Sequence, residues 1–325
     1  MRAPALCLLS CLILCGPVCA LPDMTPDALL RDHLWRQLIA KPKGERPVMG
    51  LVLSAGSLRA AAHVGVISVL ENADFPIDVV AGTSMGAIVG ALYASGKSVK
   101  RLRELAASLK VSSGSNLNSF SLLRLLLFDK LLSSKNVEKF VREEIGDITF
   151  DELKKPFACV AMDLYSGEGI IFRNGELAPA VRASMNLPGV FAPVEYRHRY
   201  LVDGGVVDFI PIDAARLLGA DWVLASITES DYTYAKPKNV FQSLEQVIDI
   251  RGSLLSREQK KDANFLIEPA VGDIGFSDAK RANETVDRGV VAASKKVTAA
   301  KESLLLFSLD SLMKDYLQKG SDRGR

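Results

Sequence analysis

The chain has 325 residues, 48% of them hydrophobic, which is enough for one large domain or two ordinary ones. Its 40 lysines and arginines nearly balance 38 aspartates and glutamates, so the composition gives no indication of a nucleic-acid partner. Four of the five cysteines lie within the first twenty residues, which argues against a disulfide framework or a cysteine metal site in the main part of the chain.

The first twenty residues have the pattern of a secretory signal peptide. Met1-Arg2 is a positive start, residues 5–15 form an apolar core, and Val18-Cys19-Ala20 offers small residues before a cleavage point at Leu21. The apolar core is too short for a bilayer, which takes roughly twenty residues to span. We therefore predict an exported protein, periplasmic or secreted. The alternative is a lipoprotein signal, which would leave the protein attached to a membrane.

An N-terminal helix is expected next, because Thr25-Pro26-Asp27 has the composition of a helix start. A charged, proline-bounded connector follows it. We accordingly divide the chain into a signal peptide (1–20), a helix and connector (21–46), a main domain (47–295) and a C-terminal helix with a frayed tail (296–325).

The main domain opens with alternating strands and helices. Continuous apolar runs at 48–53 and 77–81 predict buried parallel strands, and residues 60–70 between them predict a helix. Gly86, Gly90 and Ala94 form a bare stripe that would let a second helix lie close to the sheet. This β-α-β-α order indicates a parallel sheet with helices on its faces.

Later segments continue the mixture of strands and helices. Residues 117–132 hold ten Leu and Phe in sixteen positions, which predicts a helix over the core or, alternatively, an apolar cap or membrane-facing surface. Strands at 157–162 and 168–172 are predicted to form a hairpin, and residues 194–202 to form two strands joined by Arg197-His198. Further strands are predicted at 220–227 and 265–267, helices at 179–185, 240–255 and 279–297, and a final helix or appendage at 304–317.

The strongest chemical signal is Gly82-Thr83-Ser84-Met85-Gly86, between the second strand and the second helix. It matches the G-x-S-x-G nucleophile elbow, in which a serine sits on a cramped strand-to-helix turn. A Cβ at Gly82 or Gly86 would collide with neighbouring backbone in such a turn. Ser84 is therefore the candidate nucleophile.

A nucleophilic serine needs a base, and the chain has three histidines: His33, His63 and His198. The hydrolase order for this elbow is Ser, acid, His. Asp203, directly before Gly204-Gly205, is the second position of chemical interest, although an aspartate before paired glycines usually only stabilises a turn. Only His198 follows Ser84 and no histidine follows Asp203, so counting excludes a conventional triad in that order. The remaining alternatives are a histidine from an unusual place or a carboxylate that acts directly on the serine.

Four motifs in order resemble the patatin-like phospholipase family, in its bacterial branch. They are Leu51–Ser54 with Arg59 and Ala61–Val66, Gly82–Gly86, Ala183–Pro193, and Asp203-Gly204-Gly205. The resemblance implies a three-layer α/β/α fold with a mainly parallel central sheet and a nucleophile elbow.

The resemblance also implies a catalytic Ser84–Asp203 dyad that forms an acyl-enzyme from an ester. The implied activity is that of a carboxylic ester hydrolase, a lipid acyl hydrolase of the phospholipase A or lysophospholipase type. Its substrate would be a phospholipid or lysophospholipid, with contact to a membrane surface. No cofactor and no metal are expected.

The chain departs from the family at the oxyanion loop, which usually reads G-G-G-x-R-G. Here Gly56 and Arg59 match, whereas Ala55, Ser57 and Ala60 replace glycines. Backbone N–H groups survive any such replacement, but a left-handed residue would cost roughly 1–2 kcal/mol. The loop leaves a second possibility: a weakened or inactive patatin-fold protein that binds lipid or a protein partner.

Overall fold

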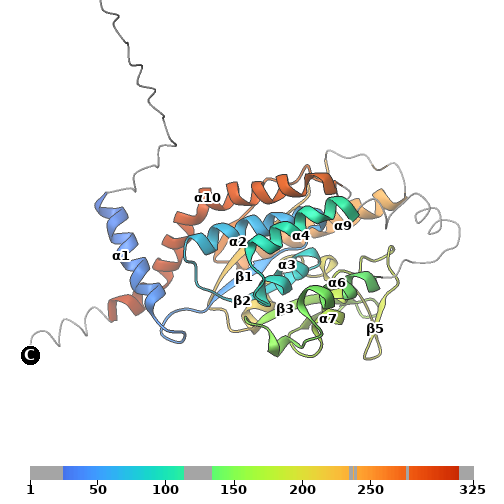
Figure 1. Ribbon diagram of the computed structural model, residues 1–325, viewed down its shortest axis with the longest axis horizontal. Helices are drawn as coiled ribbons and strands as arrows, with labels where there is room; N and C mark the ends of the chain where they lie inside the picture. The colour runs from blue at the N-terminus through green and yellow to red at the C-terminus, as the bar shows by residue number, and fades with distance from the viewer. Residues whose placement is uncertain (1–24, 113–133, 234–236, 238–239, 276–277, 315–325) are drawn as a thin grey trace, which may run out of the picture.

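The computed structural model describes residues 25–112, 134–233, 237, 240–275 and 278–314 (Figure 1). An eight-stranded sheet forms the central layer of this part of the chain, in the order β5-β6-β3-β2-β1-β7-β8, with β4 also paired to β3. The strands are β1 (Met49–Leu53), β2 (Ile77–Thr83), β3 (Phe157–Asp163), β4 (Gly169–Phe172), β5 (Val194–Tyr196), β6 (Arg199–Asp203), β7 (Trp222–Ser226) and β8 (Phe265–Ile267).

The middle of the sheet is parallel and one side of it is antiparallel. β3, β2, β1, β7 and β8 pair in parallel, whereas β4, β5 and β6 form antiparallel pairs on the β3 side. Parallel neighbours need long crossovers, and the helices after β1, β2 and β7 supply those to β2, β3 and β8. The predicted hairpins at 157–172 and 194–202 are confirmed.

Helices cover both faces of the sheet, so the predicted three-layer fold is confirmed. Figure 1 shows α2, α4 and α10 together on one side, and α6 and α7 farther along the molecule. The helices are α1 (Pro26–Ala40), α2 (Ala62–Asn72), α3 (Met85–Ala94), α4 (Val99–Ser112), α6 (Lys135–Ile145), α7 (Leu177–Ser184), α8 (Ile212–Leu217), α9 (Val240–Gln259) and α10 (Ala282–Phe307).

Two apolar clusters lie on opposite faces of the sheet. Leu51 and Leu53 of β1 belong to the larger cluster, which packs under most of the helices. Val52, between them, belongs to the smaller cluster, which α8 covers. Successive side chains of a strand point to opposite faces of the sheet, which explains this alternation. Both faces are apolar because both are buried.

The C-terminal part differs from the prediction. The first of the two predicted helices is longer than 279–297: α10 runs unbroken from Ala282 to Phe307, so the proposed boundary between 295 and 296 falls inside a helix. Of the helix predicted at 304–317, residues 309–314 are helical after a turn at Ser308. Residues 298–303 contain no Gly or Pro, and buried Ala293, Ala300 and Leu304 continue one apolar stripe through them. The apolar segment 117–132 lies outside the described residues.

Helix α1 packs beside the end of α10, at the left of Figure 1. Its buried Trp35 lies 4.9 Å from Phe75 between ring centroids, and Phe75 lies 6.3 Å from Trp222 at the start of β7. The Lys301 ammonium sits 4.8 Å from the Trp35 ring, and Arg31 pairs with Glu302. The N-terminal helix is thus attached to the core by aromatic packing and to α10 by charge.

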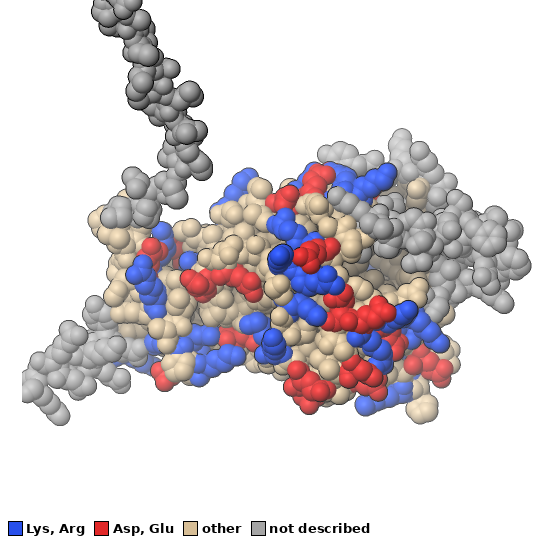
Figure 2. All heavy atoms as spheres, viewed as in Figure 1, with Lys and Arg blue, Asp and Glu red and all other residues tan. Residues whose placement is uncertain are grey.

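Charged side chains of both signs are interspersed on the face drawn in Figure 2. Arg103 pairs with Asp287 across α4 and α10, and Arg281 pairs with Glu284 within one helical turn. Such exposed pairs contribute little to stability. They do keep this face free of a large field of one sign.

Candidate active site

Ser84 lies at the sharp turn between β2 and α3. Its backbone has φ 57° and ψ −127°, a conformation that side-chain-bearing residues rarely adopt and that is found at functional sites. A Cβ at Gly82 would lie 2.6 Å from the carbonyl carbon of Gly86, and one at Gly86 would lie 2.5 Å from the Leu53 carbonyl oxygen. Both glycines therefore permit the close approach that the sequence predicted.

The sheet brings Asp203 to the same edge as Ser84. Strand β3 lies between them: Thr83 of β2 is opposite Val160, and Asp203 at the end of β6 is opposite Ala161. The Ser84 hydroxyl donates a 2.6 Å hydrogen bond from Oγ to Asp203 Oδ2. A carboxylate oxygen at this distance is within reach of the serine proton.

Burial sets the acidity of Asp203. The residue is 5% exposed, and this desolvation raises the pKa of Asp203 to about 6. The hydrogen bonds from Ser84 Oγ and from the Gly205 N–H oppose that rise, because they favour the charged form. A carboxyl group with this pKa is a stronger base than an exposed aspartate but is still ionised at neutral pH.

We expect activity to fall below about pH 6, by about tenfold for each pH unit, because protonated Asp203 cannot accept the serine proton. Activity should be full above this pH, where the carboxylate is charged. The measurement is kcat/KM against pH for a soluble ester. The double variant His33→Ala/His198→Ala should keep the same acid limb, since both histidines are exposed. Loss of the limb in that variant would identify a histidine as the base instead.

His63 is fully buried, and both of its ring nitrogens contact groups other than Ser84, so it is not placed to act as the base. Its Nε2 lies 3.1 Å from the Ser54 carbonyl oxygen and its Nδ1 lies 2.7 Å from Ser226 Oγ. The carbonyl can only accept, so we assign the proton to Nε2. Burial lowers the pKa of His63 to about 4, so the ring is neutral over the expected working range and fixes the start of the oxyanion loop.

The loop at 55–59 lies against both halves of the Ser84–Asp203 pair. A Cβ at Gly86 would approach the Ser54 carbonyl oxygen, and one at Gly205 would lie 3.1 Å from the Ala55 Cβ. The Ala55 N–H is taken by the Phe209 carbonyl, at 2.9 Å. Among the described residues, the N–H groups of Gly56 and Ser57 have no acceptor, and they are the donors that this loop can offer to an oxyanion.

The side chain of Arg59 faces helix α9 rather than the serine. It is 2% exposed, its Nη2 lies 2.6 Å from Asp249 Oδ1, and its Nη1 donates to the Ile274 carbonyl. Gly56 fits because a Cβ there would lie 2.7 Å from the Thr228 carbonyl oxygen. Arg59 and Gly56 thus shape the loop, and the loop's donors are backbone groups.

Ser57 occupies a position that favours glycine. Its φ is 48°, in the left-handed region, and its side chain makes no hydrogen bond among the described residues. We expect Ser57→Gly to raise the free energy of unfolding by about 0.5–1 kcal/mol, because relief of the strain exceeds the added chain entropy. Urea unfolding measures this change. Ser253→Gly, in the interior of α9, is the matched control and should lower stability; a loss in both variants would contradict the assigned strain.

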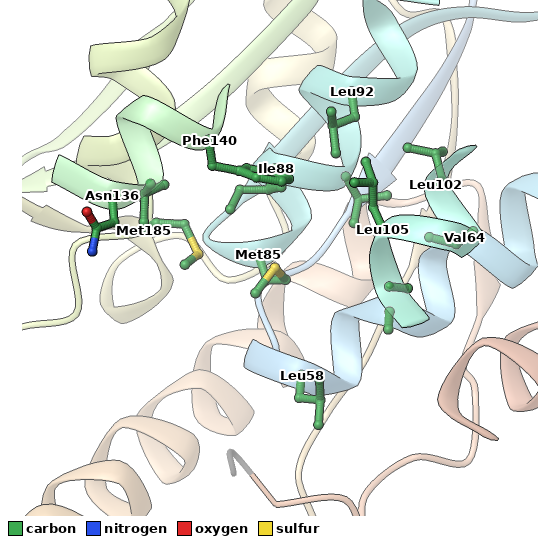
Figure 3. Close-up of a pocket in the computed structure, with 14 residues that line it drawn as sticks. Leu58, Val64, Met85, Ile88, Leu92, Leu102, Leu105, Asn136, Phe140 and Met185 are labelled. Carbon is green, nitrogen blue, oxygen red and sulfur yellow. The ribbon is translucent and has the colours of Figure 1, made fainter. Parts of the chain in front are cut away.

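An apolar cavity of about 370 Å³ opens beside the site. Figure 3 shows Met85, Ile88 and Leu92 along α3, with Phe140 and Met185 on one side and Leu102 and Leu105 on the other. Met85 follows Ser84 directly, and Leu58 of the oxyanion loop also lines the cavity. The size is that of a pocket for one small molecule.

Two residues at the end of α7 contact the pair but were assigned no role from the sequence. Ser184 Oγ accepts the Ser84 N–H at 3.0 Å, and the Asn186 carbonyl accepts the Asp203 N–H at 2.9 Å. Both lie in the Ala183–Pro193 motif, which was the only signal for them. No group of three metal-ligating side chains occurs in the described part of the chain.

This geometry defines an α/β/α protein with a nucleophile elbow, whose serine contacts a buried aspartate instead of a histidine. The chain belongs to the patatin-like phospholipase family: the family model "Patatin-like phospholipase" matches residues 51–216. Relatives in bacteria and animals each match more than half of this chain.

An uncharacterised NTE family protein of Mycobacterium tuberculosis is 37% identical over 185 residues, 55% of this chain and 48% of that protein. Human patatin-like phospholipase domain-containing protein 6 is 32% identical over 179 residues, 54% of this chain and 13% of that protein. The chain thus spans about half, or much less, of the length of these curated relatives. Among solved structures, VipD from Legionella pneumophila has a TM-score of 0.43 at 13% identity, covering 77% of this chain and 67% of that one.

Proposed function

We propose that the protein is an exported lipid acyl hydrolase of the phospholipase A or lysophospholipase type, with Ser84 as nucleophile and Asp203 as base. The observation that carries the proposal is the 2.6 Å contact between Ser84 Oγ and Asp203 Oδ2. The residue after Ser84, Met85, lines an apolar cavity. Family membership supports a lipid substrate. Export is our prediction from the first twenty residues, which lie outside the described part.

In the proposed reaction, Ser84 Oγ attacks the ester carbonyl carbon while Asp203 takes the serine proton. The carbonyl oxygen becomes negative and faces the free N–H groups of Gly56 and Ser57. The C–O bond to the alcohol then breaks, and the alcohol oxygen receives the proton from Asp203. Water then attacks the acyl carbon while Asp203 takes a proton from it. The bond from Ser84 Oγ to the acyl carbon breaks, Oγ receives the proton from Asp203, and the fatty acid leaves.

The cavity supports an acyl chain as the group bound next to Ser84. Its lining is almost entirely aliphatic and aromatic, and it includes two flexible methionines, Met85 and Met185, which follow Ser84 and Ser184 in the chain. Burying a methylene group contributes about 0.8 kcal/mol. Longer acyl chains should therefore be preferred over acetyl esters until the cavity is full.

None of the described helices is long and apolar enough to cross a membrane.

The test is labelling of the protein without its leader by a long-chain alkyl fluorophosphonate. We expect one label per chain, on Ser84, and no label on Ser84→Ala. Ser108→Ala, an exposed serine of α4, is the matched control and should label as the wild type does. A folded wild-type protein that takes no label would instead support a catalytically inactive family member that binds lipid or a partner.

A further inference from the structure

A single turn contacts both members of the Ser84–Asp203 pair. Helix α7 ends at Ser184, and the next two residues, Met185 and Asn186, turn the chain beneath the site. We propose that this turn, Ser184–Asn186, is a positioning element that sets the contact between nucleophile and base. The proposal rests on the proposed function and assigns the turn no contact with the reacting atoms.

On the nucleophile side, the contact is made to the backbone of the elbow itself. The Ser84 N–H donates to Ser184 Oγ at 3.0 Å, and Ser184 is fully buried. A buried N–H that loses its acceptor keeps the full cost of being removed from water. Because the backbone at Ser84 is already in a rare conformation, the Ser184 hydroxyl helps to hold the turn in the shape that aims Oγ at Asp203.

On the base side, the contact is made by the backbone carbonyl of Asn186. It accepts the Asp203 N–H at 2.9 Å, and the Asn186 side chain is itself fixed at both ends. Its Nδ2 donates to the Ala192 carbonyl at 2.9 Å, and its Oδ1 accepts from Ser134 Oγ at 2.6 Å. A fully buried amide with its partners satisfied has little freedom to move.

The two contacts lie only two residues apart in the turn, whereas Ser84 and Asp203 are 119 residues apart in the chain. A short turn therefore fixes two backbone points whose separation decides the Oγ–Oδ2 distance. The residue between them, Met185, lines the apolar cavity. An acyl chain in the cavity would press on the same turn, so acyl-chain length should affect kcat as well as KM.

The test is Ser184→Ala, which removes one oxygen from a buried site. We expect kcat to fall about 5- to 100-fold with KM little changed, the size expected for one buried donor left unpaired. The hydrogen bond from Ser84 lowers the pKa of Asp203, so weakening that bond should raise this pKa. The acid limb of the pH profile should therefore move above pH 6. Ser308→Ala is the matched control: it removes a buried hydroxyl, bonded to the Leu304 carbonyl, far along the chain.

A loss of stability alone would lower activity in both variants in proportion to the unfolded fraction, and it would not shift the acid limb. Wild-type kcat and an unshifted limb in Ser184→Ala would overturn the proposal. If the wild-type protein takes no fluorophosphonate label, the proposed function fails, and the turn is tested separately by amide hydrogen exchange at Ser84. We expect that amide to be protected in the wild type and to exchange at least tenfold faster in Ser184→Ala; equal exchange would refute the positioning role.

Discussion

Asp203→Asn is expected to lower kcat by about 10²–10⁴-fold while the fold stays intact. The asparagine amide has nearly the shape of the carboxylate. In the wild type the Gly205 N–H donates to Asp203 Oδ1 at 2.7 Å, and the amide oxygen can accept the same bond. Its NH₂ group would then face Ser84 Oγ and could not take the serine proton. Steady-state hydrolysis of a medium-chain ester at pH 8 measures the loss, and the fluorophosphonate labelling rate should fall with it.

The matched control is Asp208→Asn, five residues farther along. Burial raises the pKa of Asp208 to about 6 as well, and its Oδ1 accepts from Gln259 Nε2 at 2.8 Å, not from Ser84. An asparagine oxygen can accept the same bond, so we expect wild-type kcat. If Asp203→Asn kept wild-type kcat, another group would have to be the base; if both variants lost activity equally, charge near the site rather than proton transfer would be responsible.

Gly86→Ala is expected to have the largest effect on stability, a loss of about 1–3 kcal/mol or more in the free energy of unfolding. The added Cβ would lie 2.5 Å from the Leu53 carbonyl oxygen and closer still to that of Ser54. Both oxygens belong to the backbone at the end of β1. A buried backbone cannot move aside as the far end of a flexible side chain could. Relief requires α3 to shift, and Ser84 shifts with it, so kcat should fall in the protein that remains folded.

Gly169→Ala is the control for this substitution. Gly169 lies at the exposed start of β4, and its nearest neighbour to an added Cβ is a Val207 methyl group at 3.7 Å, an ordinary contact. We expect a change within about 0.5 kcal/mol. Urea unfolding of both variants, with ester hydrolysis on each, separates the close approach at Gly86 from the general effect of replacing a glycine. Equal stability of the two variants would contradict the tight packing of the elbow.

Much of the fold was predictable because it is local in sequence. The apolar runs at 48–53 and 77–81 became β1 and β2, and the tip at Arg197-His198 became a tight hairpin turn with positive φ at both residues. The extent of α10 was not predicted, because residues 298–303 are small or polar, with Ala300 the buried one among them, and such a stretch resembles a linker. The helical spacing of the apolar residues around His33 places it near their stripe and favours packing. The residue is instead exposed, and its Nε2 lies 3.0 Å from Gln37 Nε2.

The site was predictable only in its residue types. Gly82 and Gly86 mark the elbow, and the absence of a histidine after Asp203 pointed to a carboxylate as one of two candidates for the base. The 2.6 Å contact, the left-handed φ of Ser57 and the bonds from Ser184 and Asn186 depend on strand order and register. Those are set by packing between segments a hundred residues apart, which no local pattern encodes.

The aromatic packing of α1 gives the protein an optical probe that is separate from its chemistry. The chain has two tryptophans, Trp35 and Trp222, and both contact Phe75. Trp222 pairs with Met49 at the start of β1, whereas Ser84 follows the opposite end of the neighbouring strand. Intrinsic fluorescence should therefore respond when α1 detaches or the sheet unfolds, and stay constant when only the serine or its aspartate is altered. Fluorescence emission and ester hydrolysis recorded on one sample would then distinguish two kinds of variant. A misfolded variant changes in both, whereas a folded but inactive variant loses hydrolysis alone.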